Sequence, residues 1–447
     1  MIANKNIPAR KDPNDLLKKG VWLYFILLVL EGALRKWVLP GLASPLLIIR
    51  DPLALWLIYT AWNRNLLPAN IYLVGILVIG LVGTVASVLF GHGSLPVAIY
   101  GARPYLIHFP LIFVIGALLT REDVEEVGKV MLYACIGMAV LITLQFYTPQ
   151  SSLVNRGIGG DMEGSGFSGS MGFYRPSGTF SFSNGVTLFF SFAAAYIIYF
   201  WLKPGTVNKM VLIGATLGLL AAIPMSISRG LLFSVGVSVM FSFAAVSRNP
   251  KLLSKIIGAG IAIVLVAVVL SFTSQFQTAM TAFTARFENA NASEGGVQST
   301  IMDRYFGGLF RAFSFDEALP FFGYGFGILS NVGTTLLSGK VVSGISEGEW
   351  GKGIYESGVI LGFGIILIRL SFSVKILRKA YGKLSMGDIL PWMLLSFFLL
   401  SVPQGNWSQP TSLGFSVVIG GLLIASLKTG KKKTEIQIVD DNYKSLA

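Results

Sequence analysis

The sequence predicts an all-α, polytopic integral membrane protein, and three observations support this prediction. Of the 447 residues, 53% are hydrophobic and 13% are charged, and the mean hydropathy is +0.68. Apolar runs of about 20 residues, long enough to cross a bilayer as helices, follow one another along most of the chain. Alternate connections between these runs are rich in lysine and arginine. A transmembrane β-barrel would instead show alternating segments of about ten residues.

Twelve apolar runs are candidate membrane-spanning helices, of which the eleventh is among the shortest. They lie at residues 16–38, 45–62, 70–90, 104–119, 126–147, 180–202, 208–226, 229–247, 253–272, 352–374, 389–403 and 410–427. The first run follows a polar stretch and lacks a small-residue cleavage site, which favours a retained helix over a signal peptide. An even number of spans places both ends of the chain on the same side of the membrane.

The distribution of basic residues predicts which side that is. Of the 35 lysines and arginines, 23 fall in one set of alternate loops and the two termini. The positive-inside rule assigns this set to the cytoplasm. The net charge of +13 therefore reflects topology and does not indicate a nucleic-acid partner. The tail from Lys428, with three consecutive lysines at 431–433, is expected to lie near anionic lipid headgroups.

The chain divides into four parts under this topology. Residues 1–272 hold nine spans, 273–351 form a large outer loop, 352–427 hold three spans, and 428–447 form a cytoplasmic tail. A second outer loop, 149–179, is rich in glycine and serine. It suits a mobile cover over a polar substrate, or a linker without function.

The large outer loop is expected to be partly helical. Its first apolar residues recur at helical spacing, so the ninth span should continue as an amphipathic helix; they are Phe276, Ala279, Met280, Phe283 and Phe287. Thr300 and Asp303 resemble a capping box. The following apolar stripe leaves Arg304 and Arg311 together on the opposite side of a second helix, displayed at the membrane surface or snorkelling to headgroups. Gly323–Gly327 follows no strand, so we expect a tight turn and not a dinucleotide loop.

Arginines at the outer membrane border are the sharpest candidates for a binding site. The guanidinium group binds phosphate through a planar fork and stays charged. The residues expected to converge are Arg103, Arg175, Arg229, Arg286, Arg304 and Arg311. A lipid-linked phosphate or diphosphate is the expected ligand of the group. For any single member, a salt bridge or a headgroup contact is the alternative.

Two acidic residues near the tenth span are candidates for acid–base chemistry. Glu349 and Glu356 lie seven residues apart, on roughly one helical face. Either could act as a base or accept a hydrogen bond from a sugar hydroxyl, and Trp350 could stack on a sugar ring. The alternative is that these carboxylates cap the N-terminus of the span.

Other charged residues are expected to be structural. Glu31 and Arg35 have the spacing of an intrahelical ion pair, and Arg50 with Asp51 is interpreted in the same way. The two histidines, His92 and His108, and the single Cys135 offer no disulfide and no cluster with metal-ligand spacing. We expect no metal and no cofactor.

Several of these motifs together resemble the O-antigen ligase and O-antigen polymerase family of bacterial inner-membrane glycosyltransferases, over about residues 100–370. The motifs are Arg175-Pro-Ser-Gly-Thr-Phe180, Ser226-Ile-Ser-Arg-Gly230, Arg304, Pro320-Phe-Phe-Gly-Tyr-Gly-Phe-Gly327, Glu356-Ser-Gly358 and Leu361-Gly362. The resemblance implies a GT-C-like helical scaffold. It also implies inverting, metal-independent transfer of a glycan from undecaprenyl diphosphate, with Arg175, Arg229 and Arg304 holding the diphosphate.

One departure from the family bears on the activity. Ligases of this family place a histidine near the end of the large outer loop, where this sequence has Glu349-Trp350. The departure favours a polymerase of O-antigen or exopolysaccharide repeat units, with Glu349 deprotonating the acceptor hydroxyl. A polymerase of this kind would work in the cytoplasmic membrane alongside a flippase and a chain-length regulator.

Two alternatives to a polymerase stay open. A ligase would transfer the finished polymer to a lipid or protein acceptor. A transporter or flippase of lipid-linked sugars would need charged or broken helices near the middle of the membrane. The sequence places charges mostly at the ends of the apolar runs, which is why we favour an enzyme.

Overall fold

The computed structural model describes residues 12–248, 250, 253–294, 319–337 and 348–428. Within these ranges the protein is almost entirely helical, with one short hairpin of β1 (Ser168–Ser170) and β2 (Phe173–Tyr174). This confirms the all-α class. The helices proposed from Thr300 to Phe313, with Arg304 and Arg311, and the tail after Lys428 lie outside the described residues.

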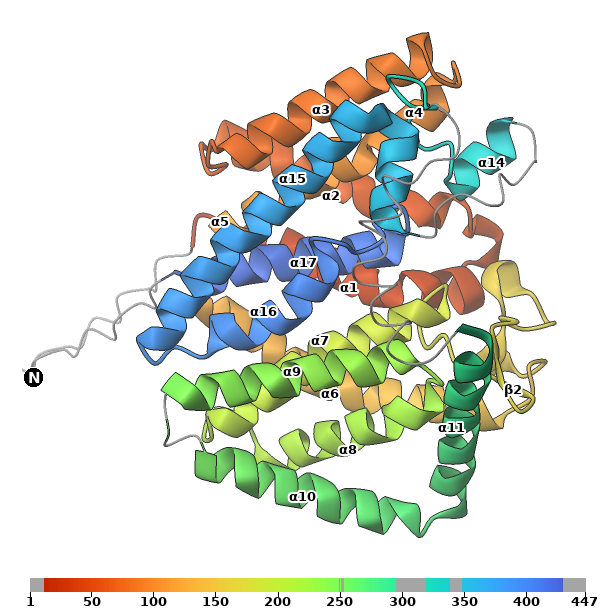
Figure 1. The fold of residues 1–447 in the computed structure, drawn as a ribbon, viewed down its shortest axis with the longest axis vertical. Helices are drawn as coiled ribbons and strands as arrows, with labels where there is room; N and C mark the ends of the chain where they lie inside the picture. Colours follow the sequence, from red (N-terminus) through yellow and green to blue (C-terminus); the bar gives the residue numbers. More distant parts are fainter. Residues whose placement is uncertain (1–11, 249, 251–252, 295–318, 338–347, 429–447) are drawn as a thin grey trace, which may run out of the picture.

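The helices follow one another with short connections (Figure 1). They are α1 (Asp15–Ala33), α2 (Arg50–Asn63), α3 (Ile71–Leu89), α4 (Leu95–Arg103), α5 (Phe109–Leu118), α6 (Arg121–Tyr147), α7 (Ser183–Leu202), α8 (Lys209–Met225), α9 (Arg229–Arg248), α10 (Leu253–Ser271), α11 (Ser274–Glu294), α14 (Asn331–Leu337), α15 (Glu349–Ser385), α16 (Leu390–Ser401) and α17 (Pro410–Ser426). The π-helical turn η1 (Leu34–Val38) extends α1, and η4 (Pro104–His108) joins α4 to α5. Short 3₁₀ turns lie at Pro40–Leu42, Pro45–Ile48, Leu153–Asn155 and Ile158–Gly160.

Several helices have the length and composition of membrane spans. Six described helical segments qualify, or seven if the bent pair α10 and α11 counts as one, and three shorter apolar helices accompany them. Their outward sides are apolar: Val74, Leu81 and Val85 of α3 are 56%, 59% and 58% exposed. Such faces suit contact with lipid tails. The number of twelve spans stays a prediction.

The helices run between two opposite ends of the bundle (Figure 1). We call one of these ends the Lys18 end. There, Lys18 Nζ at the start of α1 lies 2.9 Å from the Asp123 carboxylate at the start of α6. Lys428 Nζ, after α17, donates to the Leu119 carbonyl, after α5, at 2.8 Å. These segments therefore share one end, as the predicted alternation of basic loops requires.

The opposite end, here the Trp407 end, gathers the connections that the sequence predicts to face outside. The loop 402–409 between α16 and α17 lies here. Arg50 Nη2, at the start of α2, donates to the Pro410 carbonyl at 2.6 Å, and the Asn184 side chain at the start of α7 hydrogen-bonds to that of Gln409. The candidate site lies at this end.

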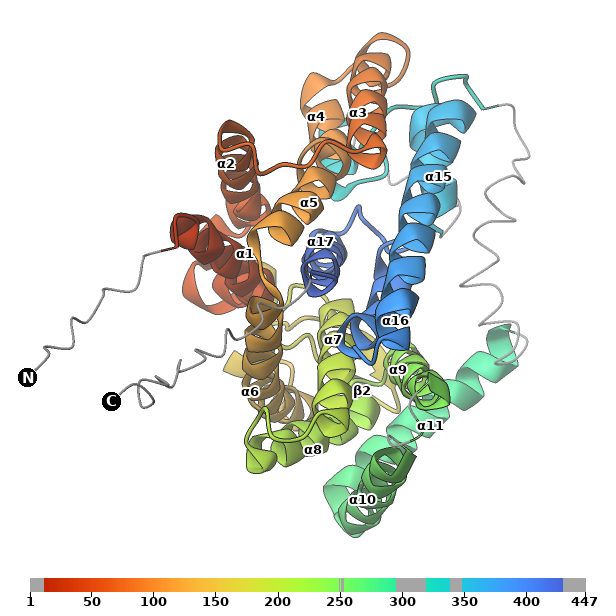
Figure 2. The ribbon, with the colours of Figure 1, turned by 90° about the vertical axis from the view of Figure 1, so that its left-hand side faces the viewer.

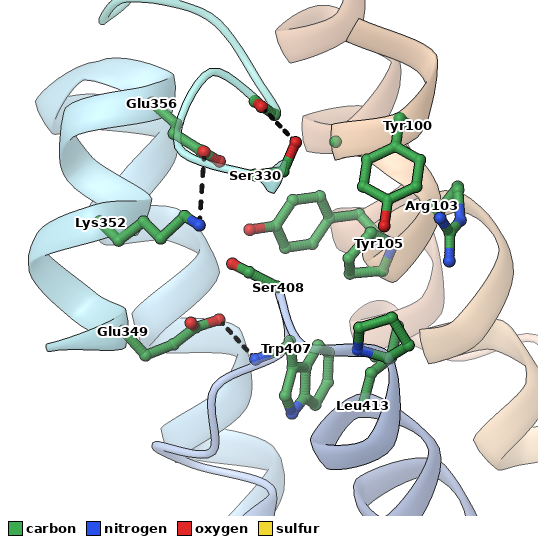
Figure 3. Close-up of a pocket in the computed structure, with 14 residues that line it drawn as sticks. Tyr100, Arg103, Tyr105, Ser330, Glu349, Lys352, Glu356, Trp407, Ser408 and Leu413 are labelled. Carbon is green, nitrogen blue, oxygen red and sulfur yellow. Dashed lines mark hydrogen bonds and ion pairs between the residues drawn. The ribbon is translucent and has the colours of Figure 1, made fainter. Parts of the chain in front are cut away.

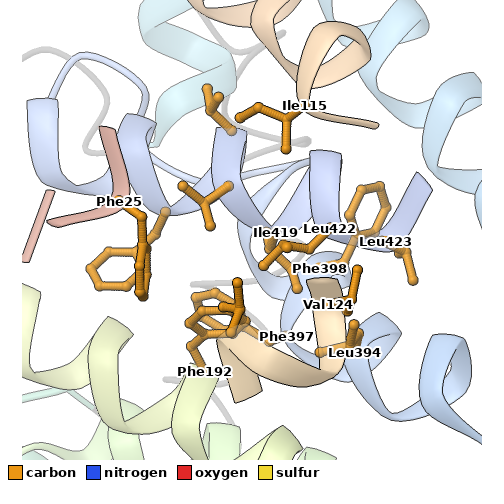
Figure 4. Close-up of a cluster of buried hydrophobic side chains, with 14 of the residues drawn as sticks. Phe25, Ile115, Val124, Phe192, Leu394, Phe397, Phe398, Ile419, Leu422 and Leu423 are labelled. Carbon is orange, nitrogen blue, oxygen red and sulfur yellow. The ribbon is translucent and has the colours of Figure 1, made fainter. Parts of the chain in front are cut away.

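Helix α17 forms the centre of the bundle (Figure 2). It is buried on all sides, as a helix that is apolar all round should be. It packs closely on α5 because both helices present glycine: a Cβ added to Gly116 would lie 2.6 Å from Ile424, and one added to Gly421 would lie 2.4 Å from Ile115. Figure 4 shows the surrounding apolar cluster, in which Phe192 of α7 stacks on Phe397 of α16 with 5.3 Å between ring centroids.

Helix α15 is broken at Gly358, which has φ +79° and ψ 169°. In a straight helix, 20 residues would separate Glu349 from Arg369 by about 30 Å, yet Arg369 Nη1 lies 3.4 Å from the Glu349 carboxylate. Residues 349–357 therefore fold back along the following part of α15. The predicted tenth span, residues 352–374, lies within α15 and includes the break, so its part before Gly358 belongs to the folded-back segment. Arg369, which lies within the predicted tenth span, binds the carbonyls of Val402 and Gly405 and so lies at the Trp407 end.

The predicted continuation of the ninth span into an amphipathic helix is half correct. The helix forms as α11, and its apolar face is buried at Phe276, Ala279 and Phe283. It does not continue α10, because the chain bends by 103° between them.

Candidate functional site

A pocket at the Trp407 end brings together three distant parts of the chain (Figure 3). It holds about 430 Å³ of space, counting the part open to solvent. One wall comes from α4 and η4, a second from the folded-back start of α15, and a third from the loop before α17. The side chains that matter here are Tyr100, Arg103, Tyr105, Glu349, Lys352, Glu356, Trp407 and Ser408.

Glu349 is held by one of its two carboxylate oxygens. Oε1 accepts the Trp407 backbone N–H at 3.0 Å and faces Arg369 Nη1 at 3.4 Å. Oε2 is buried and has no hydrogen-bond partner among the described residues. The carboxylate is therefore fixed in orientation, and its second oxygen is a buried acceptor whose hydrogen-bonding capacity is unused within the described chain.

Arg369 ties this carboxylate to the third wall. Its Nε and Nη2 donate to the carbonyls of Val402 and Gly405, each at 2.8 Å, and its guanidinium lies 4.1 Å from the Trp407 ring centroid. The backbone of 402–409 is not helical, so the guanidinium satisfies carbonyls that would otherwise be buried without partners.

Trp350 lies beside the pocket and does not line it. Its indole N–H donates to the Pro403 carbonyl at 2.9 Å, and its ring packs near Ile354 and Ile366. Trp407, which we did not single out from the sequence, supplies the indole in the pocket wall instead.

Glu356 shares the pocket with Glu349, as their seven-residue spacing predicts. Its carboxylate also accepts the Leu329 N–H at 3.1 Å, and Lys352 Nζ, 3.9 Å away, donates to the Leu329 carbonyl at 2.9 Å. This carboxylate is thus occupied in holding the returning loop 319–330, whereas Glu349 keeps a free oxygen.

The run Gly323–Gly327 forms the predicted tight turn. Gly323, Gly325 and Gly327 have φ values of +70°, +105° and +83°, which favour glycine. The turn sits directly on α4, because a Cβ on Gly101 would lie 2.2 Å from the Gly327 nitrogen. Phe326 N–H donates to Ser87 Oγ at 2.7 Å. The turn thereby closes the top of the pocket against α3 and α4.

Arg103 connects the pocket to a buried polar network. Its Nε lies 2.6 Å from Asp51 Oδ2, and its guanidinium lies 4.2 Å from the Tyr100 ring centroid. Asp51 Oδ1 is 3.1 Å from His108 Nε2, and His108 Nδ1 is 3.1 Å from the Tyr24 hydroxyl. Within the described chain, Nη1 of Arg103 is buried without a hydrogen-bond partner.

The network continues through Arg50 to α1. Arg50 Nη1 donates to the Tyr24 hydroxyl at 3.4 Å, and Nη2 lies 3.7 Å from Glu31 Oε2. Glu31 Oε1 pairs with Arg35 at 3.1 Å, which confirms the intrahelical pair. The expected pairing of Arg50 with Asp51 is wrong. Adjacent helical residues do not face each other, and each finds its partner on another helix.

Arg175 and Arg229 lie at the same end but outside the walls of the pocket. Arg175 follows the hairpin and donates its N–H to the Phe167 carbonyl at 2.8 Å. Arg229 begins α9, two residues after Ile227. Gly169 of the hairpin packs closely on the Ile227 side chain, because a Cβ added to Gly169 would lie only 2.7 Å from it. The hairpin thus connects the two arginine-bearing segments. Arg286 is half-buried on α11, whose start also packs near the hairpin.

The loop 149–179 is folded and held by side chains from α1 and α6. Lys36 Nζ donates to Ser177 Oγ at 3.0 Å and to the Gly178 carbonyl at 2.7 Å. Gln145 Oε1 accepts the Gly178 N–H at 2.7 Å. This segment is therefore ordered by contacts with the preceding helices.

Several site residues escaped the sequence analysis: Lys36, Tyr100, Tyr105, Lys352, Arg369 and Trp407. Lys36 and Arg369 each interrupt a predicted apolar span, which was a usable signal because such charges need partners. Tyr100, Tyr105 and Trp407 carried no comparable signal, since aromatic residues are common throughout the chain.

Within the described ranges, no group of three or more histidine, cysteine, aspartate or glutamate residues could hold a metal ion. The pocket instead combines carboxylates, cations, hydroxyls and aromatic rings, a set suited to a polar organic ligand. No protein-family model, curated protein or solved structure matches the chain.

Proposed function

We propose that the protein is a polysaccharide polymerase of the bacterial cytoplasmic membrane. It would transfer a glycan from undecaprenyl diphosphate to an acceptor sugar hydroxyl at the outer face, by inverting chemistry without a metal. The observation that supports this best is Glu349, a carboxylate in the pocket wall with one anchored oxygen and one buried oxygen that has no hydrogen-bond partner among the described residues.

The acceptor sugar would occupy the pocket. The aromatic side chains of Trp407, Tyr100 and Tyr105 line the pocket and would give the sugar ring apolar contacts. Glu349 Oε2 would take the proton from the acceptor hydroxyl as the oxygen attacks the anomeric carbon. The bond to the carrier diphosphate breaks with its electron pair leaving on the phosphate.

The donor diphosphate would lie beside the pocket, near Arg175 and Arg229. These arginines, with Arg304 by resemblance, would stabilise the charge that develops on the leaving diphosphate. The hydrogen bond between Ser228 and Thr187, at 2.8 Å, ties the Arg229 turn to α7. Because Asn184 at the start of α7 bonds to Gln409, the donor region and the acceptor pocket share one rigid connection.

The test is elongation of a lipid-linked glycan by the purified protein in detergent. Glu349→Gln keeps the shape of the side chain and should slow elongation by about 10²–10⁴-fold, the usual effect of losing a general base. Glu126→Gln, exposed at the Lys18 end and paired with Lys129, is the matched control and should elongate normally. Elongation at the wild-type rate by Glu349→Gln would remove the assignment.

A ligase is distinguished by what accumulates on the carrier lipid after gene deletion. Loss of a polymerase leaves single repeat units, whereas loss of a ligase leaves long chains.

One observation favours a transporter as the second candidate. Helix α15 is broken at Gly358, and the non-helical segment 402–409 is hydrogen-bonded to Arg369 in the part of α15 that follows the break. Broken helices around a polar pocket are typical of transporters. Glycan elongation in detergent, where no sealed compartment exists, would exclude pure transport.

A further inference from the structure

The buried network behind Arg103 carries more positive than negative charge. Its members are at most 9% exposed, and they comprise three guanidiniums and two carboxylates: Arg35, Arg50, Arg103, Glu31 and Asp51. With a neutral imidazole at His108, the excess is one positive charge. Lys36 is not counted in this network, because its ammonium group donates instead to the Ser177–Gly178 turn. An unbalanced buried charge is costly unless an anion pairs with it.

The opposite wall of the pocket does not supply that anion. Its two carboxylates face two cations, Glu356 with Lys352 at 3.9 Å and Glu349 with Arg369 at 3.4 Å. The wall is therefore balanced. The positive excess belongs to the side of Arg103.

Arg103 is the member of this positively charged network that lines the pocket. The residue is 7% exposed and lines the wall, and its Nη1 has no hydrogen-bond partner among the described residues. A guanidinium with an unused N–H is a strong binder of carboxylate. The pocket thus offers a donor for an anion on one wall and, at Glu349 Oε2, an acceptor for a hydroxyl on another.

We infer that the pocket selects an acidic sugar of the uronic-acid class, with its carboxylate on Arg103 and a hydroxyl on Glu349. A single carboxylate matches the excess of one charge, whereas a diphosphate would exceed it. This inference rests on the proposed function for the role of the sugar as acceptor, and it names the class of that acceptor.

Binding of two simple probes to the purified full-length protein tests the inference. Methyl β-glucuronide and methyl β-glucoside differ only in a carboxylate against a hydroxymethyl group. Binding can be followed by calorimetry and by tryptophan fluorescence, since Trp407 lines the pocket. We expect the glucuronide to bind at least tenfold more tightly, as a charge-assisted hydrogen bond should provide.

Variants of Arg103 locate the effect. Arg103→Gln should abolish the preference for the glucuronide, and Arg103→Lys should retain part of it because the charge remains. Arg64→Gln, an exposed arginine whose side chain bonds to the Pro13 carbonyl at the Lys18 end, is the matched control and should bind as the wild type does. If Arg103→Gln does not fold, the comparison of the two probes on the wild type and on Arg103→Lys decides the question.

Three outcomes of the binding experiments would overturn the inference. They are equal affinity for the two probes, no binding of the glucuronide by folded protein, and displacement of the glucuronide by inorganic diphosphate at lower concentration than by free glucuronate. The last would assign the anion to the carrier diphosphate. Elongation of a neutral glycan at the full rate would contradict the inference but support the proposed polymerase. Binding of the glucuronide without any elongation would support the inference on the pocket but contradict the polymerase.

Discussion

Replacing Gly358 by alanine should disrupt the pocket, although Gly358 does not line it. Gly358 reverses the chain so that residues 349–357 lie along the following part of α15. Without the reversal, Glu349 would move away from Arg369 and from the Trp407 backbone. The substitution therefore tests whether the break in α15 is what positions the carboxylate.

The expected cost follows from two features of the site. The backbone conformation, φ +79° with ψ 169°, lies in a region used essentially by glycine alone, and an alanine there costs about 1–3 kcal/mol. A Cβ would also lie 2.0 Å from the Phe321 carbonyl oxygen and 2.8 Å from the Gly323 nitrogen. Both are backbone atoms, so the turn must shift, at a further cost of about 1–3 kcal/mol. Together these two effects should lower the free energy of unfolding by about 2–6 kcal/mol.

The assay pairs thermal unfolding in detergent with glycan elongation. Gly353→Ala is the matched control because it lies in the same short helix and its Cβ would meet nothing within 4 Å; it should be neutral or stabilise the helix by about 1 kcal/mol. Gly358→Ala should lower the melting temperature and abolish elongation. The reasoning is refuted if Gly358→Ala melts and elongates like the wild type, or if both variants lose activity alike.

Three further substitutions have definite expected outcomes. Arg369→Met should destabilise the protein by about 3–5 kcal/mol, because it leaves the Glu349 carboxylate buried without its cation; adding Glu349→Gln should recover part of the melting temperature, and no recovery would speak against the pairing. Gly101→Ala should lower the melting temperature, because its Cβ would lie 2.2 Å from the backbone of the turn 323–327. Arg121→Gln, at the Lys18 end, removes a part-buried bidentate pair with Asp388 and should lower the melting temperature while leaving elongation unchanged; lost elongation in folded protein would contradict the separation of the two ends.

Hydrophobic length and charge were sufficient to predict the helical class, and the structure agrees on the order of most helices. The break in α15 was not predicted, because Ser357-Gly358 stands in an apolar stretch where glycine is common in membrane helices. Its effect appears only in three dimensions, where Phe321 occupies the space that a Cβ would need. In a straight α15, Arg369 would lie about 30 Å from Glu349, so the ion pair between them could not be predicted.

The spacing of residues along one helix predicted which carboxylates share the pocket. It did not predict which charged residues from different helices form ion pairs. Glu349 and Glu356 share the pocket as their spacing requires. Which partner each charge takes depends on neighbours from other helices, as Arg50 and Asp51 illustrate. Whether Arg175 and Arg229 join the pocket also depended on loop folding, and the structure places both outside the walls that Arg103 lines.

The position of the pocket walls along the chain has a consequence for biogenesis. Tyr105 and Pro410 line the same pocket, yet about 300 residues of synthesis separate them, or roughly 15–60 s at 5–20 residues per second. During that interval the nascent N-terminal helices hold Arg50 and Arg103 inside the membrane before α17 exists to cover them. The Glu31 and Asp51 carboxylates are the partners already made by then. They would keep these early helices in the bilayer until the C-terminal helices arrive.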